Sequence, residues 1–139
     1  MKIISDSLSF STRGFSDMKD LTQEVSKKLS EKGLQNGILN LFVPGSTGGL
    51  TTIEHEPGLV EDFSEFMEKI IPSNVTYHHD ARWGDGNGFS HVRASLVGAS
   101  LNVPFSNGTL SLGTWQQIVF LDFDNRSRSR MVLLQFMGE

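Results

Sequence analysis

Two nearly continuous apolar runs near the end of the chain place the strongest constraint on its fold. Gln116 to Phe123 reads QQIVFLDF and Arg130 to Met137 reads RMVLLQFM. Both runs predict strands, and Asp124 to Ser129 forms the turn between them. Strands that are apolar on both faces have to be covered on both sides. An oligomer interface could supply the second cover.

Two amphipathic helices are predicted in the first half of the chain. The first spans residues 16–32 and the second spans residues 57–71, each with apolar side chains at helical spacing on one face. Gly33 suits the position that follows a helix, and Pro72 stops the second helix. Both patterns are typical of helices that cover a sheet, so we assign no function to them.

Shorter apolar or alternating segments predict the remaining strands, at residues 2–10, 37–44, 50–55, 91–97, 101–105 and 109–112. The glycine-rich segment Gly45–Gly49 is interpreted as a hairpin turn, although such a turn can also form a backbone nest for an anion. Asn107-Gly108 predicts a second hairpin with a type I′ turn. This order of elements indicates an α+β fold. We expect one domain over residues 1–139, with two main helices on a mostly antiparallel sheet or sandwich.

Composition excludes several classes of function. The net charge is −4, so no basic field is available to attract nucleic acid or an anionic membrane surface. The chain has no cysteine, which excludes disulfides, zinc–thiolate sites and a thiol nucleophile. No apolar run approaches the ~20 residues of a membrane span, and the first residues do not form a signal peptide. We therefore expect a cytoplasmic protein.

The stretch from His78 to Gly98 (HHDARWGDGNGFSHVRASLVG) carries most of the chemistry. It contains three of the four histidines of the chain, and its centre, Gly84–Gly88, alternates glycine with short polar residues. Such a run predicts a loop that brings polar groups close to bare backbone. From Ser90 onward the alternation predicts a strand with His91, Arg93 and Ser95 on one polar face.

Four segments together resemble the YjbQ-like family, whose members are sometimes labelled secondary thiamine-phosphate synthases. The segments are GSTGGLTTIEHEPG (45–58), YHHD (77–80), GDGNGFSHVRASLVGAS (84–100) and VPFSNGTLSLGTWQQIVFLDFD (103–124). The resemblance implies a compact α+β fold, commonly a homo-trimer, with a polar pocket at the subunit boundary. It also implies transfer of a pyrimidine-methyl diphosphate onto a thiazole phosphate.

The resemblance further implies site residues. Glu54, Asn87 and His91 match family positions and are our candidate catalytic residues, and Gly113 and Gln116 match the L-G-x-W-Q piece. Two positions depart from the family pattern, because many members have histidine where this chain has Gly45 and Phe89.

The residues themselves leave several roles open. His79 and His91, with Glu54 or Asp80, could hold a divalent metal such as zinc or magnesium. Since neighbouring side chains of an extended segment point to opposite faces, only one of His78 and His79 can join His91. For a phosphorylated small-molecule ligand we assign substrate binding to Arg82, Asp85, Arg93 and Gln116. Alternatively, the histidines are ordinary hydrogen-bonded loop residues, and Asp85 and Asn87 cap turns.

Three functions therefore remain as hypotheses. The first is a thiamine-phosphate synthase-like enzyme. The second is a non-catalytic module that binds a phosphorylated metabolite or a metal, which is consistent with the two missing histidines. The third is a metal-dependent hydrolase, which only the cluster of histidines and carboxylates favours.

Overall fold

The computed structural model describes residues 1–139 and contains two antiparallel sheets and four helices. In chain order the elements are β1 (Lys2–Thr12), β2 (Asp17–Asp20), α1 (Thr22–Lys32), β3 (Gly37–Phe42), β4 (Gly48–Ile53), α2 (Pro57–Ile70), α3 (His78–Trp83), α4 (Gly88–Val97), β5 (Ser100–Ser106), β6 (Thr109–Leu110), β7 (Gln117–Asp122) and β8 (Arg128–Gly138). The larger sheet has the strand order β1-β8-β3-β5-β6 and the smaller one β2-β7-β4. The expected α+β class is confirmed.

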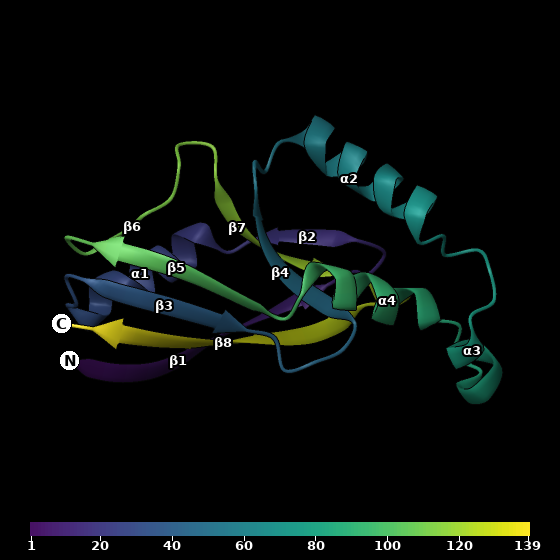
Figure 1. The fold of residues 1–139 in the computed structure, drawn as a ribbon, viewed down its shortest axis with the longest axis horizontal. Coiled ribbons are helices and arrows are strands. Elements are labelled where there is room, and N and C mark those ends of the chain that lie inside the picture. Colours follow the sequence, from purple (N-terminus) through teal and green to yellow (C-terminus); the bar gives the residue numbers. More distant parts are fainter.

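The main core lies between the two sheets, and α1 contributes to it. Its members include Leu39, Leu41, Leu134 and Phe136 from the larger sheet, Leu50, Ile118 and Phe120 from the smaller sheet, and Val25 and Leu29 from α1. The alternation of apolar residues along β3 and β8 turns one face of the larger sheet inward. Both termini lie at the end of the molecule opposite α3 (Figure 1).

A second core covers the other face of the smaller sheet. Val119 and Leu121 of β7 contact Met67 of α2 and Phe89 and Ala94 of α4 in this cluster. Strand β7 is therefore buried on both faces, as its continuous apolar run predicts. Strand β8 differs, because its alternate residues Met131 and Leu133 are 44% and 41% exposed.

The predicted strand at His91–Val97 is wrong, since these residues belong to helix α4. The buried residues of this helix include Phe89, Ser90, Arg93 and Ala94, a spacing that matches one helical face. The apparent alternation of Val92, Ala94 and Leu96 arose by chance: Ala94 is buried, whereas Val92 and Leu96 are exposed. The predicted loop lies at residues 84–87, and the residues before it, His78–Trp83, form helix α3.

Two other predictions, the start of the first helix and the turn at Gly45, are wrong, whereas the second hairpin is confirmed. The first helix begins at Thr22, because Asp17–Asp20 pairs with β7 as the edge strand β2. The segment around Gly45 is not a hairpin turn, because β3 and β4 belong to different sheets. The hairpin at Asn107-Gly108 is confirmed, with φ values of 51° and 72° that suit a type I′ turn.

None of the helices is both long enough and apolar enough to cross a lipid bilayer.

Candidate functional site

Helices α3 and α4 bring His79 and His91 into contact. The two imidazole rings have centroids 4.4 Å apart and planes inclined by 39°. Gly84 and Gly86 have φ values of +71° and +67°, which let a short loop join the two helices. Gly88 then allows close approach, because a Cβ atom there would lie only 2.6 Å from the Tyr77 Cβ.

Two carboxylates flank His79. Its Nδ1 lies 3.4 Å from Asp85 Oδ1 and 3.8 Å from Asp80 Oδ1. The backbone N–H groups of Tyr77 and Gly88 donate to Asp80, which holds the pKa of this carboxyl below its usual range. His79 Nδ1 is buried but has no hydrogen-bond partner. A buried polar atom without a partner is unusual in a protein.

His91 also lines a cavity of about 300 Å³ between α4 and the segment that leads into β4. The cavity is lined by Gly45, Ser46, Gly48, His91, Ala94, Ser95, Gly98 and Ala99. No carboxylate lies in this lining, and the backbone N–H of the lining residue Ser46 donates to no carbonyl of the protein. A free N–H group in the same lining as an imidazole is compatible with an anionic ligand.

Asn87 is buried beneath this site. Its Nδ2 donates to Asp124 Oδ1 over 3.3 Å, and its Oδ1 has no partner. The structure thus brings together five of the predicted site residues, namely His79, Asp80, Asp85, Asn87 and His91.

Glu54 and Gln116 lie elsewhere in the same chain. Glu54 follows the last residue of β4, whereas the His91 cavity touches Gly48 at the first residue. Five steps along a strand span about 17 Å. The Gln116 side chain accepts from Gly113 N–H and donates to Thr52 Oγ1, near the Glu54 end of the strand.

The two predicted arginines occupy different environments. Arg93 is only 3% exposed and donates to the Ile71 carbonyl, Ser16 Oγ and Glu68. It lies two residues from His91 and therefore on the opposite side of α4. Arg82 is exposed, and its guanidinium carbon lies 5.6 Å from the Trp83 ring centroid. His78 is exposed as well.

A buried ionic network that was not predicted from the sequence lies behind the site. Asp122 and Asp124 are both 0% exposed; Arg130 binds Asp122, and Arg128 binds Asp124. Burial alone would raise the pKa of Asp124, but hydrogen bonds from Asn125 N–H, Arg128 and Asn87 hold it below its usual value. The sequence signals for this network were the alternating acids of D-F-D (122–124) and the alternating arginines of R-S-R (128–130).

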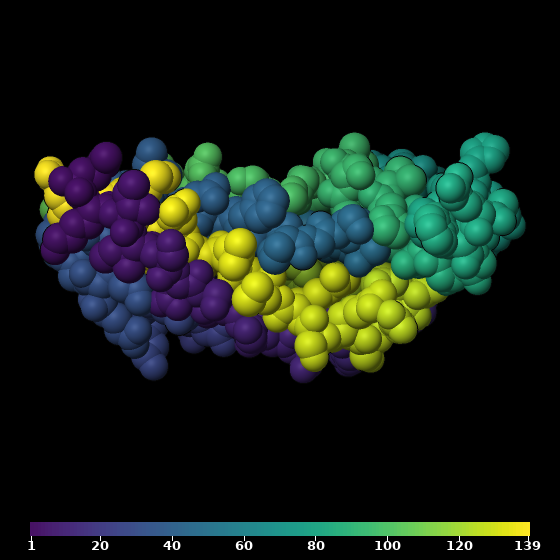
Figure 2. Space-filling model, turned by 90° about the horizontal axis from the view of Figure 1, so that it is seen from below, coloured from purple at the N-terminus to yellow at the C-terminus, as the bar shows by residue number.

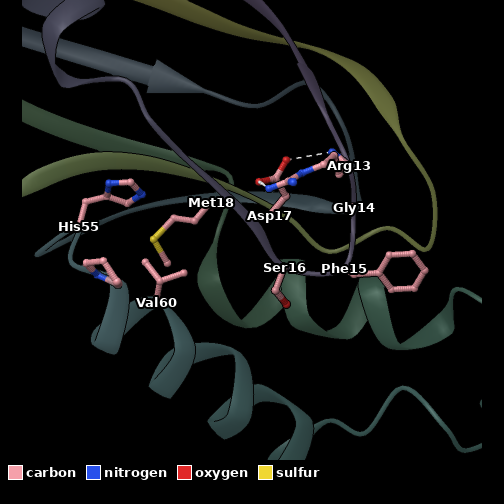
Figure 3. A pocket seen from close by; sticks show the side chains of 9 residues that line it. Arg13, Gly14, Phe15, Ser16, Asp17, Met18, His55 and Val60 are labelled. Carbon is pink, nitrogen blue, oxygen red and sulfur yellow. Dashed lines mark hydrogen bonds and ion pairs between the residues drawn. The ribbon is translucent and has the colours of Figure 1, made fainter.

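The largest cavity, about 840 Å³, shares no residue with this site. Figure 3 shows Met18, Val60 and His55 on one side of it, with Phe15 directed away. Asp17 Oδ2 accepts from the Arg13 backbone N–H, and the Arg13 guanidinium lies 3.8 Å from Asp17 Oδ1. We find no convergent set of reactive groups there.

Comparison with known proteins shows relatives over nearly the full chain. A family model described as "UPF0047 protein YjbQ-like" matches residues 6–139. A UPF0047 protein of Methanothermobacter thermautotrophicus is 36% identical over 139 residues, which cover 100% of this chain and 95% of that protein. UPF0047 protein YugU of Bacillus subtilis is 36% identical over 123 residues, covering 88% and 90%.

Solved structures share the fold. A YbjQ-like protein of unknown function from Sulfolobus solfataricus superposes with a TM-score of 0.93 at 30% identity, covering 99% of both chains. A hypothetical protein from Aeropyrum pernix gives a TM-score of 0.90 at 34% identity, covering 98% of this chain and 99% of that one.

Proposed function

This chain belongs to the UPF0047 protein YjbQ-like family, and from the geometry of its site we propose that it is a metal-dependent enzyme that acts on a small phosphorylated metabolite beside His79 and His91. The observation that carries the proposal is the meeting of His79, Asp85 and His91 from two helices and their connecting loop. His91 is the member of this group that also faces a cavity.

The donor atoms around His79 fit a transition metal. One ligand atom from each of His79, Asp80 and Asp85 lies within 4.8 Å of the others. Two ligands about 2.1 Å from a tetrahedral ion are about 3.4 Å apart, close to the distance between His79 Nδ1 and Asp85 Oδ1. An imidazole donor favours zinc over magnesium, which prefers oxygen ligands. The His91 ring contacts that of His79 at a tilt of 39° and also lines the cavity, so we assign His91 primarily to the substrate.

The cavity beside His91 supports a phosphorylated substrate. The free N–H group of Ser46 is available to an anion, and no carboxylate in the lining would repel it. Among the assigned substrate-binding groups, Arg82 is exposed on α3, whereas the guanidinium of Arg93 is used inside the protein.

The reaction class we would test first is thiamine-phosphate synthesis. The ring nitrogen of the thiazole phosphate forms a C–N bond with the pyrimidine methylene carbon, and the C–O bond to diphosphate breaks with its electron pair. Bound at His79, a divalent metal supplies charge neutralisation for the diphosphate. His91 would donate a hydrogen bond to the leaving oxygen, and the released diphosphate takes up one proton from solvent at neutral pH.

Elemental analysis of tag-free protein tests the metal. We expect about one transition metal per chain in wild type, loss of the metal in His79→Ala, and retention in His78→Ala, because His78 is an exposed neighbour. Wild-type protein that takes up no zinc from solution would contradict the proposal. Product analysis with phosphorylated thiazole and pyrimidine substrates then separates synthesis from metal-dependent hydrolysis.

A non-catalytic binding module is the second candidate, and Gly45 favours it. Gly45 lines the cavity at a position where many members of the family carry histidine, so a reacting group is missing there. Phe89, the other departure, is buried in the second core and removes nothing from the cavity wall. Ligand binding without turnover, in the presence of metal, would identify this second function.

A further inference from the structure

The turn at Asp124 and Asn125 contacts the loop between α3 and α4 at two points. Asn87 Nδ2 donates to Asp124 Oδ1 over 3.3 Å, and Asn125 Nδ2 donates to the Asp85 carbonyl oxygen over 2.9 Å. Only residues 84–87 separate the two helices. Both contacts therefore act on the segment that determines how His79 and His91 meet.

The turn is itself held firmly. Asp124 is fully buried, and Arg128 Nη2 lies 2.7 Å from its Oδ2, which also accepts from Thr47 Oγ1 over 3.3 Å. Its backbone carbonyl accepts from Phe15 N–H over 2.7 Å. A group fixed from this many directions can position a loop accurately, as outer-sphere carboxylates do in metal sites.

Asp124 also determines which way the Asn87 amide points. A carboxylate paired with arginine only accepts hydrogen bonds, so the amide nitrogen has to face it. The amide oxygen then points away from Asp124, and it is buried without a partner. A buried acceptor that is left unpaired destabilises the protein, because its desolvation is not offset by a hydrogen bond. This oxygen is therefore suited to an electropositive group.

We propose that Asp124 and Asn125 are positioning residues that fix the loop Gly84–Asn87, and through it the contacts of His79 with Asp85 and with His91. The inference rests on the proposed function where it concerns metal affinity, but the positions of the two imidazoles are independent of it. Neither residue touches the ligand in this role.

Asn125→Ala and Asn125→Asp test the proposal, and Asn74→Ala is the control because Asn74 is exposed on another loop. Asp cannot donate to the Asp85 carbonyl, so both Asn125 variants lose the same bond. We expect Co²⁺, titrated into the metal-free protein, to bind roughly tenfold more weakly to both. In NMR spectra of metal-free protein, the imidazole signals of His79 and His91 should move toward those of an exposed histidine.

The outcomes separate this inference from the proposed function. Wild type that binds no Co²⁺, together with moved imidazole signals in both Asn125 variants, would support positioning and contradict the metal. Wild-type signals and affinity in either variant would overturn the inference, because neither side chain can replace the lost donor. Asp124→Asn should move the same signals, and if it fails to fold, the Asn125 variants still decide the question.

Discussion

Gly45 is the residue at which a single side chain should add a metal ligand to the cavity beside His91. A Cβ atom there would have only Arg130 Nη1 at 3.7 Å and Val43 Cγ1 at 3.8 Å within 4 Å, both ordinary contacts. Because Gly45 lines the cavity that His91 faces, Gly45→His adds an imidazole to the cavity wall. We expect Gly45→His to bind Co²⁺ roughly tenfold more tightly than wild type in a competitive titration.

Gly45→Ala is the matched control, because it adds the Cβ atom without a ligand and should leave the affinity unchanged. Phe89→His adds a histidine at the other position that departs from the family pattern, and there it should change stability rather than metal binding. Phe89 is 3% exposed within the second core, so a histidine there should lower the free energy of unfolding by about 2–4 kcal/mol without adding a ligand. Equal Co²⁺ affinity of Gly45→His and Gly45→Ala would show that residue 45 cannot reach the metal.

The sequence allowed part of the site to be predicted at the level of single residues. His79, Asp85, Asn87 and His91 gather because they lie in or beside one short glycine-containing loop, and that proximity is local in sequence. Asp124 reaches Asn87 across 37 residues, and Arg128 pairs with Asp124 inside the protein. Such contacts depend on tertiary packing, which the residue types alone do not specify.

Helix α4 shows why the element type was harder to predict than its existence. The inner face of α4 contains a buried arginine, so this face is not uniformly apolar in the sequence. The Arg93 guanidinium fills that face by donating twice to the Ile71 carbonyl at the end of α2. Its carbon also lies 5.0 Å from the Phe89 ring centroid. A polar residue at a core position concealed the helical period.

Arg93→Met tests this link between α2 and α4. Methionine keeps much of the buried volume but leaves the Ile71 carbonyl without its side-chain donor, so the free energy of unfolding should fall by about 2–3 kcal/mol. Glu68→Gln removes only the charge of the partly exposed Glu68 side chain that Arg93 contacts. The free energy of unfolding should therefore fall by less than about 1 kcal/mol. Urea titration with an unchanged m-value would measure both effects. Equal losses of stability in Arg93→Met and Glu68→Gln would show that the bonds to the Ile71 carbonyl are not the main contribution of Arg93.

Strand β1 and helix α1 are joined by a pH-dependent contact. Lys32 and Lys28 both donate to Asp6, and these bonds hold the pKa of the Asp6 carboxyl well below its usual range. Because the pKa of this carboxyl is lowered in the folded state, the carboxylate stabilises the fold at pH values above the unfolded-state pKa of about 3.9. This stabilisation is lost as the pH falls below that value.

Asp6→Asn should therefore be less stable than wild type by about 1 kcal/mol at pH 7, with the difference shrinking between pH 4 and pH 2. Guanidinium unfolding of both proteins across that range measures it. Lys27→Gln is a suitable control, since the Lys27–Glu31 pair is exposed and its nitrogen and oxygen lie 3.9 Å apart. A difference that stays constant with pH would show that the carboxylate charge is not responsible.

At the scale of the whole molecule, the sequence predicted helices packed on sheets, but it did not show which apolar surface remains exposed. The outer face of the larger sheet pairs Phe42 with Leu133 and Ile38 with Met137 across β3 and β8. Ile38, Phe42 and Leu133 are between 41% and 45% exposed. Figure 2 shows the segments of β1, β3 and β8 side by side on one face. Exposed apolar surface of this kind is typical of an interface.

We propose that this face packs against other copies of the chain in a homo-trimer. An assembly could also bring Glu54 of one protomer to the His79–His91 site of another, since the two lie apart within one chain. Light scattering at micromolar concentration should then give three times the 15.4 kDa chain mass. Leu133→Lys should lower that mass, because it places a charge in the apolar row.

Phe66→Lys is the control, because Phe66 is 57% exposed on α2, away from the sheet face. It should keep the wild-type mass, and circular dichroism of both variants should match wild type, since neither side chain belongs to a core. A monomeric wild type would contradict the trimer. A trimer that survives Leu133→Lys but dissociates with Phe66→Lys would assign the interface to the helical face, where Ile70 of α2 and Leu96 of α4 are also exposed.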